Sequence, residues 1–238
     1  MKFRFLFIIF IFGLYTSISF HSQNCTWNGS IDGDWHTIGN WTTSDLGAVI
    51  ASRVPTSSDS VIIISSVNDP IIGAAAEAGT LTINSGGLLE ISGVNFLNVA
   101  GTVTINGTLT LNTFIGGIEC GSDWDDTGGS FILNGFDKVI FDGSGSHTIN
   151  TNSNFIMLEI NSGTYKASSN FSVQSSLSIS GGAILDPDVN TITIDPGTSF
   201  TNNGNLVFSN SSGIFDVNGT ATFTNSGTID MTAGGTLK

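Results

Sequence analysis

The sequence predicts an all-β fold: a right-handed, single-stranded parallel β-helix, or β-solenoid, with a Trp-rich cap at its N-terminal end. Three observations predict this fold. Short strands that alternate Thr or Ser with an aliphatic residue or Phe recur along the chain, Gly and Asn separate them, and helical periodicity is nearly absent. Units that repeat in this way cannot bury their apolar side chains alone, so they stack around a shared core.

The repeated segments each hold apolar residues at alternate positions, and all but 190–195, which ends at Asp195, end at Gly or Asn, which tolerate the positive φ angles of tight corners. The clearest segments are 79–86, 101–107, 108–112, 176–182, 190–195, 205–210 and 220–225. Because alternate side chains of a strand point to opposite faces, the apolar residues are predicted to face the interior. These core positions are Leu81, Ile83, Val103, Ile105, Leu109, Leu111, Leu177, Ile179, Ile192, Ile194, Leu206, Phe208, Phe215, Val217 and Phe223.

Residues 61–238 are predicted to form the body of the solenoid. Two or three strands should make one coil of about 20–25 residues, which gives about seven or eight coils and a length of roughly 35 Å at the usual strand spacing. The repeats continue to the last residue. We therefore expect the body to be truncated at its C-terminus; the alternative is that a partner closes this end.

Residues 23–60 differ from the repeats and are predicted to form the cap. The segment is irregular, with Trp27, Trp35 and Trp41 set among Gly and Asn. An open terminal coil would expose core side chains and an unpaired strand edge, so a solenoid needs such an end piece. We expect the three indoles to fill the core of the cap. The alternative is that their flat faces form a platform for sugar rings.

Residues 1–22 have the features of a secretory signal peptide. Lys2 and Arg4 precede an apolar run over residues 5–15, and small residues follow at Ser17 and Ser19. The apolar run is shorter than the about 20 residues that a membrane-spanning helix needs. We therefore expect a secreted or cell-surface protein with no membrane span after cleavage.

The chain is strongly acidic. It contains 6 Lys and Arg residues against 19 Asp and Glu residues, a net charge of −13. Loss of Lys2 and Arg4 with the leader leaves four basic residues against the same 19 acidic ones, a net charge of about −15. Such a surface repels polyanions, so we expect no nucleic-acid partner.

One acidic segment interrupts the repeats. Residues 116–129 are predicted to form an excursion loop that carries Trp124 and three neighbouring carboxylates, Asp123, Asp125 and Asp126, close after Glu119. Carboxylate oxygens are the ligands that Ca²⁺ prefers, so this loop is the first candidate for a calcium site, and Asp32 with Asp34 is the second. The simpler interpretation is a solvated loop, since neither the EF-hand spacing nor the RTX nonapeptide repeat is present.

Two cysteines remain beyond the leader, Cys25 and Cys120. An oxidising compartment outside the cell would allow a disulfide between them. The sequence does not place them within bonding distance, so the disulfide stays open at this stage.

The order of these features resembles the start of large secreted surface proteins of Bacteroidota-type bacteria, which contain pectin-lyase-like and filamentous-haemagglutinin-like β-helix repeats. The resemblance covers the chain beyond the leader and implies surface display and adhesion-like roles, without catalytic residues. Many such proteins end in a type IX secretion sorting domain, which this sequence does not contain. The residues that carry the resemblance are Trp27-Asn28-Gly29, Asp34-Trp35, Asn40-Trp41, Val54-Pro55, Asp59 and Val61-Ile62-Ile63, followed by the LTINSGG and VTINGTLTL coils.

From these features we expect a structural or adhesin-like protein whose loops contact glycans, other cells or matrix. The alternative is the N-terminal β-helix part of a carbohydrate-active enzyme, a polysaccharide lyase or hydrolase, with its catalytic residues outside this chain. In addition, Asp59-Ser60-Val61 resembles the site at which Bacteroidota-type bacteria O-glycosylate exported proteins.

The sequence offers little for catalysis within these residues. Lyases that act on polyuronates need a basic residue to take the α-proton. Asp125 and Asp126 alone are weak evidence for a general acid/base pair. His147 is expected at the surface. The basic residues beyond the leader are Arg53, Lys138, Lys166 and Lys238.

A third class of function is ice binding, because outward Thr side chains can order water. Thr-x-Thr pairs occur at 80/82, 102/104, 108/110, 191/193 and 222/224. Their irregular spacing does not maintain one face. Thr is also a favourable outward residue in any strand, which is the simpler explanation.

Overall fold

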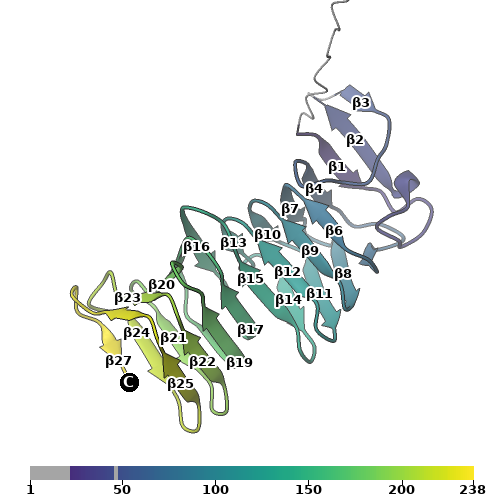
Figure 1. Ribbon diagram of the computed structural model, residues 1–238. Coiled ribbons are helices and arrows are strands. Elements are labelled where there is room, and N and C mark those ends of the chain that lie inside the picture. The colour runs from purple at the N-terminus through teal and green to yellow at the C-terminus, as the bar shows by residue number, and fades with distance from the viewer. Residues whose placement is uncertain (1–21, 46–47) are drawn as a thin grey trace, which may run out of the picture.

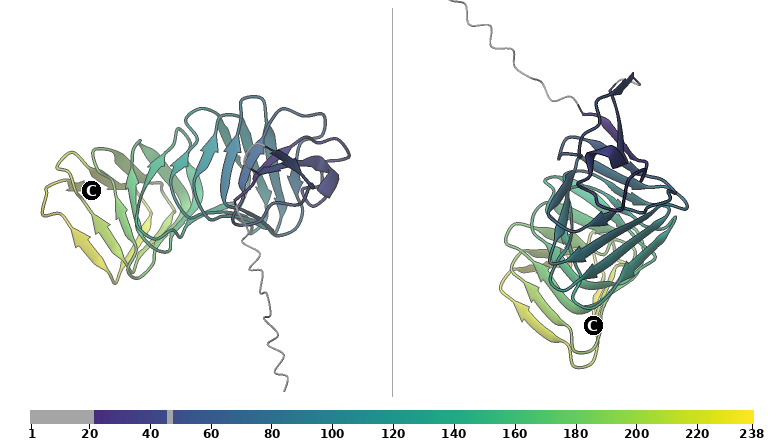
Figure 2. Two further views of the ribbon diagram at one scale, coloured as in Figure 1. Left: turned by 90° about the horizontal axis from the view of Figure 1, so that it is seen from above. Right: turned by 90° about the vertical axis from the view of Figure 1, so that its right-hand side faces the viewer.

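The structure, a computed structural model, describes residues 22–45 and 48–238. It is all-β, with parallel strands stacked in a solenoid of about eight turns, so the predicted β-solenoid is confirmed. Figures 1 and 2 show the coils following one another along an elongated body, from β4 near the N-terminal end to β27. The predicted signal peptide lies outside the described residues except for its last position. Within the described part of the chain, no helix is long and apolar enough to cross a membrane.

One face of the solenoid is a 12-stranded sheet, here the first sheet, to which every coil contributes one strand. From β4 onward its strands are parallel, and neighbours in the sheet belong to successive coils. In spatial order the strands are β26 (Thr228–Asp230), β23 (Asn205–Val207), β20 (Ile184–Asp186), β18 (Thr164–Ala167), β16 (Ser146–Asn150), β13 (Trp124–Asp125), β10 (Val103–Ile105), β7 (Thr80–Ile83), β4 (Ser60–Ile63), β1 (Asn24–Trp27), β2 (Trp41–Asp45) and β3 (Ala48–Ile50).

Two further sheets complete the coils. The second sheet is β14 (Ser130–Leu133), β11 (Thr108–Thr113), β8 (Leu88–Gly93) and β5 (Ile71–Ile72). The third sheet is β27 (Thr236–Leu237), β24 (Ile214–Val217), β21 (Thr191–Ile194), β19 (Phe171–Ile179), β17 (Phe155–Ile160), β15 (Lys138–Phe141), β12 (Gly117–Cys120), β9 (Phe96–Val99) and β6 (Ala76–Ala78), with β22 (Ser199–Asn202) and β25 (Thr222–Asn225) branching from β19. The long strand β19 pairs with β21 through its first half and with β22 through its second half. The later coils therefore also have three sides.

The strand register gives the length of each coil. Along the first sheet, Val61 lies beside Leu81, Leu81 beside Val103, Val103 beside Trp124 and Trp124 beside Ile149. The successive differences in residue number are 20, 22, 21 and 25. The predicted coil of 20–25 residues is therefore correct over this part of the chain.

The core runs along the inside of the coils, and all but two of the predicted core positions are buried. Val217 is half-buried against the core. Phe223 is 40 % exposed, so the prediction for this residue is wrong. The reason is that β25 pairs only with β22: Phe200 stacks on one side of Phe223, with ring centroids 4.7 Å apart, and the described chain places no strand on the other side.

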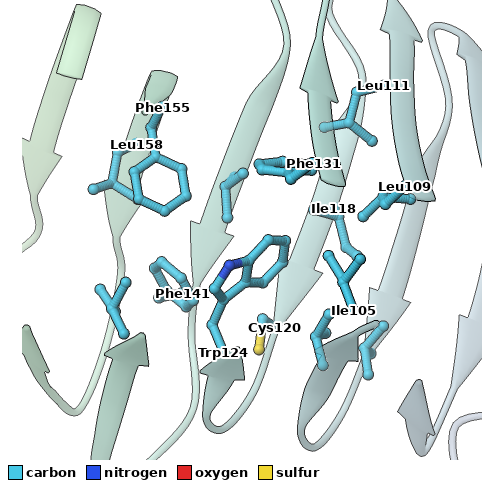
Figure 3. Close-up of a cluster of buried hydrophobic side chains, with 14 of the residues drawn as sticks. Ile105, Leu109, Leu111, Ile118, Cys120, Trp124, Phe131, Phe141, Phe155 and Leu158 are labelled. Carbon is cyan, nitrogen blue, oxygen red and sulfur yellow. The ribbon is translucent and has the colours of Figure 1, made fainter. Parts of the chain in front are cut away.

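Residues 116–129 are not the excursion loop that the sequence predicts. β12 and β13 lie in this segment and pair with strands of the coils before and after them. Trp124 points inward and is fully buried, with Phe131, Phe141 and Phe155 around it (Figure 3). The pattern is hidden in the sequence because β13 has only two residues, too few to show an alternation.

The N-terminal segment closes the first coil with antiparallel strands. β1 pairs in parallel with β4 of the first coil, while β2 pairs antiparallel with β1 and β3 antiparallel with β2. A short 3₁₀ helix, η1 (Ile38–Asn40), leads into β2. The hairpin covers the strand edge that β1 would otherwise present, which fits the predicted cap.

Candidate functional site

The three indoles of the cap form one packed cluster. Trp27, Trp35 and Trp41 are buried, and Trp41 lies edge to face with both of the others, at centroid distances of 5.0 Å from Trp27 and 4.7 Å from Trp35. The Trp27 indole donates a hydrogen bond to the carbonyl of Asn68, and the Trp41 indole donates to that of Trp35. Their faces are therefore not open to solvent as a sugar platform requires.

Asn40 organises the loop between β1 and β2. Its side chain is buried, accepts hydrogen bonds from the amides of Ile31 and Asp32, and donates to the Asp32 carboxylate at 2.7 Å. This donation is the main reason that the pKa of Asp32 lies below its ordinary value. Asp34 accepts a hydrogen bond from the amide of His36. The second candidate pair for calcium, Asp32 and Asp34, thus serves the folding of the loop.

The carboxylates of the first calcium candidate have separate surroundings. Asp126 is fully buried, whereas Asp123 and Asp125 are half-buried. Asp125 accepts hydrogen bonds from the amide and the hydroxyl of Thr127. In the part of the chain that the structure describes, no group of three or more His, Cys, Asp and Glu side chains could hold a metal ion. Calcium binding stays a prediction, which a titration monitored by the melting temperature would test.

Several acidic side chains instead join one coil to the next. Asp126 accepts hydrogen bonds from the Thr151 hydroxyl and the Asn152 amide, 2.9 Å away in each case, and both donors lie in the following coil. Burial raises the pKa of Asp126, against the effect of these donors. Asp137 accepts from the amide and hydroxyl of Thr113 in the preceding coil. Part of the acidic composition therefore has a structural role.

The two cysteines are buried and free. Cys25 in β1 pairs with Val61 in β4, a strand of the first coil. Cys120 lies in β12, two coils after β6 of the first coil. Three to four strand spacings of about 4.8 Å along the axis thus separate the cysteines, well beyond the about 7 Å Cα separation that a disulfide allows. The disulfide that the sequence left open is not formed.

Two pockets open at the junction of the cap and the first coils. The first has a volume of about 520 Å³ and is lined by Gly33, Asp34, His36, Ile71, Gly73 and Ala74. The second has a volume of about 380 Å³, and its lining includes Trp35, His36, Pro55, Glu77, Phe96 and Asn98. His36 borders both pockets, and its Nε2 lies 3.1 Å from the carbonyl oxygen of Ala75. Both volumes lie in the range of small-ligand sites.

A separate exposed apolar surface lies along one corner of the solenoid. It consists of Val94, Phe114, Ile115 and Phe136, here the apolar edge. These residues lie in the connections from the second to the third sheet in three successive coils. Their exposed fractions are 60, 68, 59 and 55 %, and the rings of Phe114 and Phe136 contact each other edge to face at 5.9 Å. Exposed apolar groups that cluster in this way mark interaction surfaces.

The four basic residues in the part of the chain that the structure describes are all neutralised locally. Arg53 pairs with buried Asp59 at 2.6 Å. The other pairs are Lys138 with Glu159, Lys166 with Asp188 and Lys238 with Asp216. None of them lines either pocket.

His147 and Ser60, two further candidates from the sequence, do not line the pockets. His147 is partly exposed at the start of β16, with Nδ1 3.3 Å from the Ser122 hydroxyl and Nε2 2.9 Å from the Ser144 carbonyl. Ser60 of the glycosylation motif is half-buried in β4, and the Asp59 beside it is fully buried. A glycosylating enzyme that recognises the Asp59 carboxylate would therefore have to act on the unfolded chain.

The Thr-x-Thr pairs are divided among the sheets. Thr82 and Thr104 are neighbours on the first sheet, one coil apart. Thr108 and Thr110 are on the second sheet, and the pair at 191/193 belongs to β21 and that at 222/224 to β25. The pairs therefore do not share one face, as their irregular spacing indicates.

A family profile described as "Domain of unknown function (DUF8693)" matches residues 26–114. This segment runs from the cap through β11 and contains all the described residues that line the two pockets, but not the acidic residues 123–126. No curated protein and no solved structure matches the chain.

The sequence patterns described above do not predict the pockets or the apolar edge. A signal for the edge was present: Val94, Ile115 and Phe136 stand beside Gly or Asn, which favour turns, where polar residues are usual. The pockets left no such signal, because their walls combine residues from the cap loop with residues up to 63 positions away, such as Trp35 and Asn98 in the second pocket.

Proposed function

We propose that the protein is exported and acts at the cell surface as a structural, adhesin-like rod that contacts glycans, other cells or matrix. The observation that carries the proposal is the apolar edge. Four large apolar side chains, each more than half exposed, lie on connections of three successive coils. Exposing them to water is unfavourable unless a partner covers them, so the edge is the natural contact surface.

The architecture supports this role. Parallel strands of successive coils are hydrogen-bonded along the whole first sheet, from β4 to β26. A continuous ladder over one shared core resists bending, and each connection can vary without disturbing the strands. Such a body holds a set of connections in a fixed row.

A bead assay tests the proposal. Beads that carry the purified chain would be applied to films of cellulose, chitin and collagen and to a layer of the producing cells. We expect retention on at least one of these surfaces. The double variant Phe114→Ser and Phe136→Ser should reduce retention about tenfold or more, since two exposed aromatic anchors are removed.

Val189→Ser is the matched control for the bead assay. Val189 is 54 % exposed but lies between β20 and β21, away from the apolar edge. It should leave retention unchanged. Equal retention of the double variant and the native chain, or no retention on any surface, would contradict the proposal.

A further inference from the structure

The two pockets at the cap junction have the mixed lining that a sugar needs. A pyranose ring has apolar C–H faces and a rim of hydroxyl groups that both donate and accept hydrogen bonds. Ile71 and Phe96 supply apolar surface, while the carboxylates of Asp34 and Glu77 supply acceptors. The side-chain amide of Asn98 donates to Glu119 at 2.8 Å, which leaves its carbonyl oxygen as a further acceptor.

A buried donor adds to this lining. Trp35 forms part of the wall of the second pocket and is 0 % exposed. Its Nε1–H has no acceptor among the described residues, in contrast to the indoles of Trp27 and Trp41. The Nε1 atom is buried behind the pocket wall, so a ligand hydroxyl accepts from it only after that wall moves, and then recovers the free energy that a buried N–H without an acceptor costs.

The charge of the junction limits the class of sugar. Asp34 and Glu77 line the pockets, and none of the described lining residues is Lys or Arg. A uronate or a sulfated sugar would meet like charge there without a cation to pair with it. An uncharged sugar has only hydroxyl groups to place, and carboxylates are strong acceptors for them.

We propose that these two pockets, on either side of His36, bind an uncharged oligosaccharide. His36 lies between them, so a chain of sugar units would pass over its imidazole, with one unit in each pocket. This inference rests on the proposed contact function. It names uncharged oligosaccharides as the ligand class, at a site distinct from the apolar edge.

Calorimetric titration of the purified chain tests the inference. The probes are cellohexaose, xylohexaose, mannohexaose and chitohexaose, with oligogalacturonate as the charged comparison. We expect at least one neutral hexasaccharide to bind and oligogalacturonate not to bind. Binding should also change the tryptophan fluorescence, because Trp35 lines the second pocket.

Two pairs of variants locate the site. Trp35→Phe replaces the indole with a smaller aromatic ring that has no N–H, and it should weaken binding about five- to tenfold. Trp124→Phe is its control, because Trp124 is also buried with an unpartnered Nε1–H but lies in the core of the body. Phe96→Ala should weaken binding similarly. Its control is Met157→Ala, which occupies the same outward row of the third sheet three coils away.

The outcomes separate this inference from the proposed function. If the beads adhere but no neutral hexasaccharide binds in the titration, the inference is wrong and the adhesive role stands. Tighter binding of oligogalacturonate, or equal weakening by Trp35→Phe and Trp124→Phe, would also overturn the inference. Sugar binding without bead retention would support the pockets and contradict the role of the apolar edge.

Discussion

At the scale of single residues, the buried carboxylates carry much of the specificity of the coil stack. Asp59 is the clearest case: it is fully buried, pairs with Arg53 at 2.6 Å, and accepts hydrogen bonds from the amide and hydroxyl of Thr56. It also accepts from the amide of Gln23, which ties the start of the cap to the first coil. Burial alone would raise the pKa of Asp59, but the Thr56 and Arg53 donors hold it below the ordinary value.

We predict that Asp59→Asn lowers the free energy of unfolding by about 2–3 kcal/mol, because Arg53 loses its partner and the buried donors lose a charged acceptor. Denaturant unfolding at pH 7 measures this. Asp216→Asn is the control: its partner Lys238 is largely exposed, so the loss should stay below about 1 kcal/mol. Equal losses for the two variants would contradict the role of Asp59.

The same carboxylate predicts a dependence of stability on pH. Its folded pKa is lowered, so its stabilising contribution is complete above the unfolded pKa of about 4 and is lost as the pH falls through the folded value. Between pH 4 and pH 2, the native chain should therefore lose more stability than Asp59→Asn does. Parallel curves for the two proteins would rule this contribution out.

The thiols should be inert in the folded chain. Burial raises the pKa of Cys120 to about 12, and burial also raises the pKa of Cys25. Because the thiolate is the reactive form, we predict that iodoacetamide at pH 8 modifies neither cysteine in the native protein and both after unfolding in guanidinium. Mass spectrometry would count the modified thiols, and rapid native labelling of Cys120 would contradict its position in the core.

At the scale of elements, the shortest strands depend on their inward side chains. β13 has two residues, yet it continues the first sheet between β10 and β16. Trp124 holds it in place through edge-to-face contacts with Phe131, Phe141 and Phe155, at centroid distances of 5.0, 6.1 and 6.4 Å (Figure 3). Aromatic packing here replaces the hydrogen bonds that a longer strand would make.

We predict that Trp124→Ala lowers the free energy of unfolding by about 3–5 kcal/mol, because it leaves a large cavity among these rings. Phe223→Ala, at a position that is 40 % exposed, should cost clearly less. Guanidinium unfolding of both variants measures the difference. A smaller loss for Trp124→Ala than for Phe223→Ala would contradict the assignment of Trp124 to the core.

The sequence was informative where strands are long enough to alternate. Leu81 and Ile83, or Ile192 and Ile194, face inward as their spacing predicts, because one residue type on every second position is a direct result of strand geometry. The segment around Trp124 was predicted to be a loop, although it contains β12 and β13, because its Gly and Asp residues are also common in loops. The two pockets could not be predicted, since no local pattern records which distant residues share a wall.

At the scale of the whole molecule, the stack creates both surfaces of interest. One corner of successive coils lines up Val94, Phe114 and Phe136, and the fold of the cap against the first coil forms the pockets. Each coil contacts mainly its neighbours, so changes at one coil should leave distant coils intact. This locality is what allows variants at the cap and at the apolar edge to be tested separately.

The measurement that tests the coil stack most directly is a spin–spin distance. Ile62 and Asn150 occupy the same outward row of the first sheet, and Thr82, Thr104 and Asp125 lie between them. Nitroxide labels on Ile62→Cys and Asn150→Cys should give one narrow distance of roughly 20 Å, about four strand spacings of 4.8 Å. A broad distribution, or a distance more than twice as long, would show that successive coils are not stacked in this register.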